Sequence, residues 1–157
     1  MATLADIERV VESYCVRWMI EVFFRTLKSG CRVESRRFET LDRMLNCVVV
    51  YLIVTWRTLF VCRLARELPH VSCEVVFDQS EWKPIFPFQE GTPPPEAAPT
   101  LREMVYPVSR LGGYVNRARG GEPGPQTVWR GLKRLHDIAQ CWIIFGPGAK
   151  TKEQLLV

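Results

Sequence analysis

Residues near the start of the chain combine an aromatic hydroxyl, a carboxylate and two cations at helical spacing. We call this set the polar stripe: Tyr14, Arg17, Glu21 and Lys28. At about 100° per residue, all of its members lie within about 60° of one line along a helix. A carboxylate among cations can bind a hard divalent ion such as Mg²⁺, while the cations hold a phosphate backbone beside it. The stripe therefore suggests metal-dependent phosphoryl transfer, although one carboxylate cannot position a metal pair without acidic partners.

A second interpretation of the stripe stays open on spacing alone. Arg17 and Glu21 stand four residues apart, and such a surface ion pair contributes about 0.2–0.5 kcal/mol on an exposed helix face.

Both interpretations of the stripe require that these residues form a helix. Thr3 is a suitable N-cap with Asp6 in the capping-box position, and Ser29-Gly30 supplies a stop. We expect the opposite face to be buried, since its apolar residues recur at helical spacing: Val16, Met19, Ile20, Phe23 and Leu27.

Residues 36–68 contain no glycine or proline and predict one long helix that ends before Pro69. Its middle is apolar nearly all round, so we expect other elements to cover it. The apolar run from Met44 to Trp56 is shorter than the roughly 20 residues that span a membrane. A buried core helix is therefore favoured, and a membrane-associated helical protein using residues 44–60 is the alternative.

The second half of the chain is divided by prolines and glycines. Val75, Val76 and Phe77 predict a short extended piece, and six prolines between Pro84 and Pro99 predict extended chain over residues 81–100. Aromatic and aliphatic residues in that segment could anchor it: Trp82, Ile85, Phe86 and Phe88. Helices are expected over residues 100–111, with Pro107 inside, and over residues 126–145. Turns are expected at Gly112-Gly113 and over residues 120–125, and a loose tail over residues 149–157.

Charge is unevenly distributed along the chain. Residues 14–66 hold ten Arg/Lys against four Asp/Glu, residues 67–105 hold two against seven, and residues 106–150 hold seven against two. Two basic blocks that flank an acidic middle suit a polyanion such as DNA, although arginine-rich helices can also simply be solvated. The six cysteines form no CxxC pair, which argues against zinc and favours a reduced, cytoplasmic setting.

Several sequence blocks resemble one large family. The spacing Tyr14-x2-Arg17-x3-Glu21-x6-Lys28 within YCVRWMIEVFFRTLKSGCRVE resembles the Y-R-E-K signature of bacterial insertion-sequence DDE transposases. The similarity continues through LDRML, VVVYLIVTWRTL and LARELP. Further on, SRLGGY and GEPGPQTVWRGLKRL look like the dimerisation domain of the Tn-five transposase group. The chain therefore resembles the C-terminal part of a cut-and-paste transposase.

The resemblance implies a mainly α fold: the helical C-terminal remnant of an RNase-H-like catalytic core, followed by a small helical dimerisation unit. The implied domains are catalytic-core helices at 1–69, a proline-rich acidic linker at 70–99, a dimerisation domain at 100–148 and a tail at 149–157. Glu21 matches the third acidic residue of the DDE triad, a ligand of Mg²⁺ or Mn²⁺. Tyr14, Arg17 and Lys28 match contacts to the transposon-end backbone. Trp129, Leu132 and Leu135 match a helical surface through which two transposases pair.

The departures from the family bear on activity. The family's two triad aspartates lie upstream on strands, whereas this chain offers Asp6, Asp42, Asp78 and Asp137, none of them in an early strand-like apolar run. We therefore expect a transposase fragment that is catalytically incomplete alone. Its expected partners are transposon-end DNA and either itself or a full-length transposase, without a membrane. The alternative is a non-catalytic interaction module that pairs with full-length transposase and inhibits it.

Overall fold

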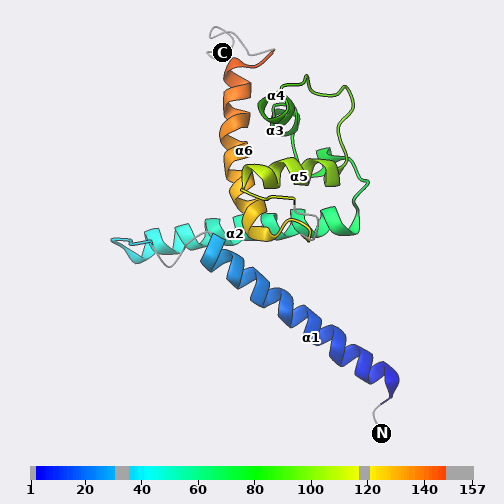
Figure 1. Ribbon diagram of the computed structural model, residues 1–157. Helices are drawn as coiled ribbons and strands as arrows, with labels where there is room; N and C mark the ends of the chain where they lie inside the picture. The colour runs from blue at the N-terminus through cyan, green and yellow to red at the C-terminus, as the bar shows by residue number, and fades with distance from the viewer. Residues whose placement is uncertain (1–2, 31–35, 117–120, 148–157) are drawn as a thin grey trace. The chain divides into compact units, whose positions relative to one another are not determined.

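The computed structural model describes residues 3–30, 36–116 and 121–147. These residues form helices and no strand, so the predicted mainly α fold is confirmed (Figure 1). The order along the chain is α1 (Leu4–Arg25), a π-helical turn η1 (Thr26–Gly30), α2 (Leu41–Glu67), a 3-10 turn η3 (Cys73–Val75), α3 (Gln79–Trp82), α4 (Ile85–Gln89), α5 (Leu101–Leu111) and α6 (Pro125–Phe145). The chain divides into two compact units, Met1–Leu59 and Phe60–Val157.

Helix α1 begins at the predicted cap. Thr3 Oγ1 accepts a hydrogen bond from the Asp6 amide at 3.3 Å, and the Asp6 carboxylate accepts one from the Thr3 amide at 2.9 Å. This reciprocal pair is the predicted capping box. The hydrogen bonds from the Thr3 amide and hydroxyl lower the pKa of Asp6, because they stabilise the ionised carboxylate.

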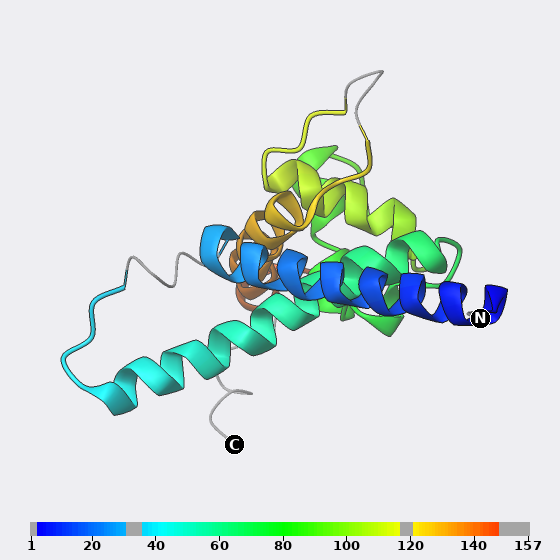
Figure 2. The same ribbon diagram turned by 90° about the horizontal axis from the view of Figure 1, so that it is seen from below.

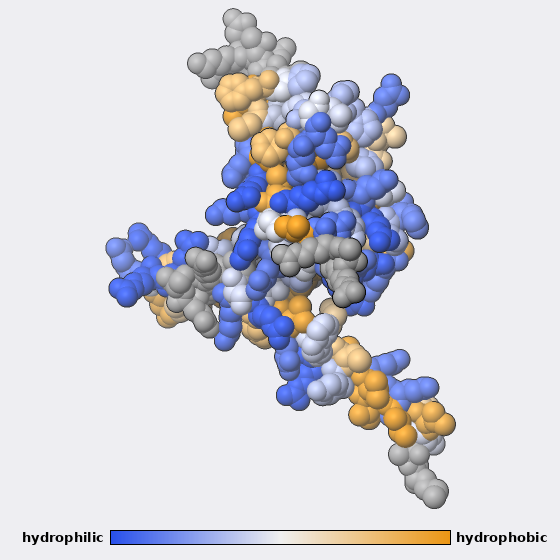
Figure 3. All heavy atoms as spheres, viewed as in Figure 1, coloured by the Kyte–Doolittle hydropathy of each residue, from blue (hydrophilic) through white to orange (hydrophobic). Residues whose placement is uncertain are grey.

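The expected buried face of α1 was wrong over most of its length. Val16, Met19 and Ile20 are exposed and Phe23 is half-buried, whereas Leu27, in the η1 turn, is buried. Figure 3 also shows apolar side chains on the surface of this helix. Apolar periodicity shows that a face can pack, but burial needs a second element against it. No described element of the unit Met1–Leu59 covers this stretch.

Helix α2 starts five residues later than predicted. Thr40 Oγ1 accepts a hydrogen bond from the Arg43 amide at 3.4 Å, which is the role of an N-cap, so the helix begins at Leu41. The expected covering of its apolar middle was wrong for Val49, Val50 and Ile53, which are exposed. Among the described residues, α2 is the one helix long and apolar enough to cross a membrane, a property it shares with core helices of soluble proteins.

The unit Phe60–Val157 holds the hydrophobic core. Its largest fully buried side chains come from every helical element of the unit: Val61, Cys73, Phe77, Trp82, Ile85, Leu101, Met104, Val108, Val128 and Leu135. Helices α5 and α6 cross closely within it in both ribbon views (Figure 1, Figure 2). Pro107 is accommodated inside α5, and its carbonyl accepts a hydrogen bond from Gln89 Nε2 of α4 at 2.7 Å.

Glycines make the close crossing of α5 and α6 possible. A Cβ atom on Gly131 of α6 would overlap the Val108 carbonyl of α5, and one on Gly112 would overlap the Thr127 carbonyl of α6. Gly113 has a different role, since its φ of 90° lies in the left-handed region. Its amide donates to the Arg110 carbonyl and the Tyr114 amide to the Ser109 carbonyl, both at 2.9 Å, which is the Schellman end of a helix.

The prediction of extended chain over residues 81–100 was wrong for its first part, which holds the end of α3 and all of α4. Two prolines occur here, but Pro84 is the N-cap of α4 and Pro87 lies in its first turn. Amides at these positions have no partner inside a helix, so a proline there loses no hydrogen bond. Trp82 and Ile85 are fully buried, as the anchoring hypothesis requires, whereas Phe88 is exposed.

The remaining predicted elements agree with the structure except at one place. The expected extended piece at Val75, Val76 and Phe77 was wrong, because Cys73–Val75 forms a 3-10 turn capped by Ser72 and Phe77 is buried in the core. The helices predicted over 100–111 and 126–145 are confirmed. The predicted turn over 120–125 is described from Gly121 onward, and the predicted tail over 149–157 lies outside the described residues.

Candidate functional site

The polar stripe is accessible from solvent along α1. Tyr14 is 71% exposed, and Arg17, Glu21 and Lys28 are exposed as well. The α-helical spacing assumed for the stripe applies to Tyr14, Arg17 and Glu21, which all lie in α1. Lys28 lies in the π-helical turn η1, where the rotation per residue is smaller than in an α-helix. Such π turns are frequent at functional sites.

The stripe does not form the ordinary surface ion pair that was its alternative interpretation. Within the described residues, Arg17 and Glu21 form no ion pair with each other, although Arg43–Glu39 at 2.9 Å and Arg63–Glu67 at 2.6 Å show that i, i+4 pairs form elsewhere in this chain. The Glu21 carboxylate and the Arg17 guanidinium can therefore each bind an external group without first breaking an internal contact.

The described residues do not fit a complete metal site. Nowhere in residues 3–30, 36–116 and 121–147 do three His, Cys, Asp or Glu side chains lie close enough together to bind one ion. Glu21 is thus a single candidate ligand. Two of the chain's aspartates take part in capping boxes, Asp6 in that of α1 and Asp78 in that of α3. No catalytic step through a metal follows from these residues alone.

The candidate pairing residues differ in accessibility. Trp129 and Leu132 are half-buried, and Leu132 packs against the core. Leu135 is 0% exposed and belongs to the hydrophobic core of the unit Phe60–Val157. A partner molecule could contact Trp129 and Leu132 without a change in the fold, whereas the buried side chain of Leu135 packs in the core and anchors α6 there.

A further apolar surface at the end of α6 was not predicted from the sequence. Ile143, Ile144 and Phe145 are exposed, Phe145 at 82%. The helical spacing of the sequence could have indicated this surface. At about 100° per residue, Ile143 lies within about 60° of Trp129 and Leu132 around the helix. Leu135 lies about 120° away from Trp129 by the same measure. Figure 3 shows apolar side chains gathered at this end of α6.

Two buried cysteines and Arg36 have local structural roles. Burial raises the pKa of Cys62 and of Cys73 to about 11, so both thiols stay protonated and act as small apolar side chains. Cys15 and Cys141 are exposed. Arg36 lies 5.7 Å from the centre of the Tyr51 ring in a cation–π contact.

Two family models match consecutive parts of the chain. The model of the transposase DDE domain matches residues 2–56. The model of the transposase Tn5 dimerisation domain matches residues 53–146, more than half of the 157 residues. The chain belongs to the Tn5 group of DDE transposases. This confirms the resemblance noted from the sequence blocks. The family uses divalent metal ions, binds DNA and self-associates, and the polar stripe of this transposase chain lies inside the matched DDE segment.

Proposed function

We propose that this transposase chain supplies a DNA-contacting helix and a pairing unit to cut-and-paste transposition in the cytoplasm. Tyr14, Arg17 and Lys28 contact the backbone of the transposon end, and Glu21 contributes the third acidic ligand of a DDE centre. Residues 1–69 act as catalytic-core helices and residues 100–148 as the dimerisation domain. The acidic segment 70–99 joins the two.

The observation that carries the proposal is the exposed polar stripe within the matched DDE segment. Its aromatic hydroxyl and cations are solvent-accessible, and Arg17 and Glu21 are not bound to each other. Solvent-accessible guanidinium and ammonium groups can form charge-assisted hydrogen bonds to phosphate oxygens. Because Glu21 is a single carboxylate, we infer that cleavage requires two further acidic ligands besides it.

Replacing Arg17 with alanine should weaken binding to a transposon-end duplex about five-fold and lower the salt dependence by about one released counterion, because one phosphate contact is lost. Fluorescence anisotropy at several salt concentrations measures both quantities. Arg9→Ala is the matched control: Arg9 is also exposed on α1 but lies about 140° away from Tyr14 around the helix. Equal losses in the two variants would contradict a specific role for the stripe and leave only general charge attraction.

We also propose that two copies pair through one edge of α6 that includes Trp129, Leu132 and the exposed Ile143. The edge is apolar and partly accessible, and Leu135 holds the helix in place from the core. Apolar surface of this kind is stabilised by burial against a like surface.

Replacing Ile143 with aspartate should weaken self-association about ten-fold or more, because a charge would be buried at the contact. Sedimentation velocity over a concentration series measures this. Cys141→Asp adds the same charge to the same helix about 120° away from Trp129 and should leave association unchanged. If both variants associate as the original chain does, pairing does not use this edge.

A second candidate function is inhibition of full-length transposase by mixed pairing. The observation that favours it is that the unit Phe60–Val157, which contains the matched dimerisation segment, has its own buried core. Co-purification with a full-length relative, lost in Ile143→Asp and retained in Cys141→Asp, would support this function. A chain that pairs only with itself would exclude it.

A further inference from the structure

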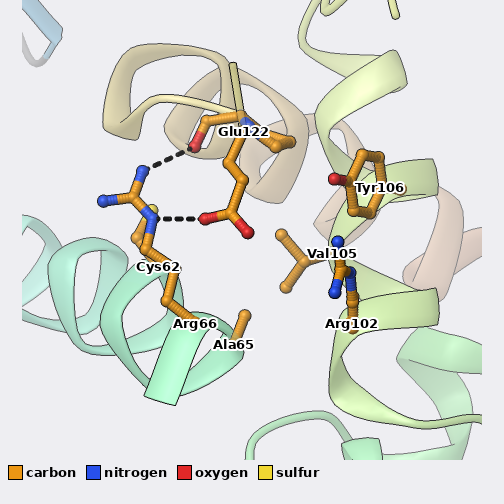
Figure 4. Close-up of a pocket in the computed structure, with 8 residues that line it drawn as sticks. Cys62, Ala65, Arg66, Arg102, Val105, Tyr106 and Glu122 are labelled. Atoms are coloured by element: carbon orange, nitrogen blue, oxygen red, sulfur yellow. Dashed lines mark hydrogen bonds and ion pairs between the residues drawn. The ribbon is translucent and has the colours of Figure 1, made fainter. Parts of the chain in front are cut away.

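A hollow in the unit Phe60–Val157 is lined by residues that belong neither to the polar stripe nor to the pairing edge (Figure 4). Its walls come from the C-terminal end of α2, the first turns of α5 and the loop that precedes α6. The lining residues are Cys62, Ala65, Arg66, Arg102, Val105, Tyr106, Glu122 and Pro123. Arg66 and Glu122 are 56 positions apart in the sequence, so no local pattern indicates the hollow.

One arginine of the hollow is occupied by an internal carboxylate. Arg66 Nε pairs with Glu122 Oε2 at 2.9 Å, and Arg66 Nη2 donates a long hydrogen bond of 3.5 Å to the Pro123 carbonyl. Both side chains of the pair are about half exposed to solvent. An exposed pair of this kind contributes little to stability and can exchange partners with a dissolved anion.

Two further donors face the same space without a partner of their own. Within the described residues, the Arg102 guanidinium forms no hydrogen bond or ion pair; the backbone amide of Arg102 is the group that bonds to the Pro69 carbonyl. The Tyr106 ring is held edge-on against Tyr114, with 6.0 Å between ring centres. Its hydroxyl points into the hollow in Figure 4 and has no hydrogen-bond partner among the described residues.

Two guanidinium groups and a phenol hydroxyl around one hollow match the oxygen atoms of a phosphate group, which accepts several hydrogen bonds at once. We propose that this hollow binds a backbone phosphate of nucleic acid through Arg66, Arg102 and Tyr106, and that Glu122 is a built-in competitor that the phosphate displaces from Arg66. Nucleic acid is favoured over a small free anion because residues 106–150, which supply Tyr106 and Glu122 to the hollow, carry seven Arg/Lys against two Asp/Glu. This surplus of positive charge attracts a polyanion.

Substitutions at two residues of the hollow should change the affinity for nucleic acid in opposite directions. Arg102→Ala removes a donor and should weaken binding of a short duplex about five-fold, with the salt slope reduced by about one. Glu122→Gln removes the competing charge and should strengthen binding about three-fold. Arg110→Ala is the matched control, because Arg110 is an exposed arginine of the same helix α5 that does not line the hollow.

Fluorescence anisotropy on the whole chain measures these affinities, and circular dichroism verifies that each variant is folded. The same series in an Arg17→Ala background separates this site from the polar stripe, since the effects of the hollow should persist there. Inorganic pyrophosphate should in addition shift the Nε–H resonances of Arg66 and Arg102 in NMR spectra. Equal losses in Arg102→Ala and Arg110→Ala, or no gain in Glu122→Gln, would overturn the proposal. Pyrophosphate shifts with unchanged duplex affinity in Arg102→Ala would overturn the assignment to nucleic acid.

Discussion

Replacing Gly131 with alanine is expected to destabilise the unit Phe60–Val157 by about 3 kcal/mol or more, because the added methyl overlaps a backbone atom of the neighbouring helix. The Cβ atom would occupy the position of the Val108 carbonyl of α5, and backbone cannot move aside as a flexible side chain can. Helix propensity alone predicts the opposite, a gain of about 1 kcal/mol for alanine over glycine. The sign of the effect therefore decides whether α5 and α6 cross as closely as the structure shows.

Urea unfolding followed by circular dichroism measures the free energy of unfolding for this variant. Gly121→Ala is the matched control, since a Cβ atom at Gly121 meets nothing within 4 Å. It should change the free energy of unfolding by less than about 0.5 kcal/mol, as ordinary surface substitutions do. A stabilised Gly131→Ala variant would mean that the helices stand further apart.

The second large effect is expected at Trp82, in the segment whose prolines suggest extended chain. Trp82 is 1% exposed, its ring lies edge-to-face with Phe86 at 6.4 Å, and its Nε1 donates to Glu74 Oε1 at 3.4 Å. Trp82→Ala should cost about 3–5 kcal/mol of stability, because a large cavity would replace the ring.

Phe88→Ala tests the same segment at an exposed position. Phe88 is 62% exposed, so its removal takes away little buried surface and should cost less than about 1 kcal/mol. The comparison uses the midpoint of thermal or urea unfolding of the whole chain. If the two variants lose the same stability, α3 and α4 do not pack on the core as described. If Trp82→Ala alone loses stability, the start of the proline-rich segment is part of the folded unit.

Much of the local structure is predictable from short-range signals. The Thr3–Asp6 box marks the start of α1, Thr100 and Glu103 form a second box at the start of α5, and Gly112-Gly113 marks its end. Each signal works because the partners of the terminal amides and carbonyls lie within a few positions in sequence. The same principle explains why the first part of residues 81–100 is helical and not extended. Proline density suggested extended chain, yet Pro84 and Pro87 occupy the N-cap and first turn of α4, where proline is tolerated.

The polar stripe follows from the sequence by itself, because residue types and their spacing along the chain define it. The family and the order of the two matched domains follow from the sequence as well, because blocks of similarity occur in that order along the chain. Burial does not follow from it. Tertiary structure alone decided that Val16 and Ile20 stay exposed, that Leu135 lies in the core, and that Arg66 meets Glu122 across a shared hollow. The physical reason is that burial and long-range pairing depend on which surfaces the chain brings together, and a periodic pattern specifies a face without specifying what covers it.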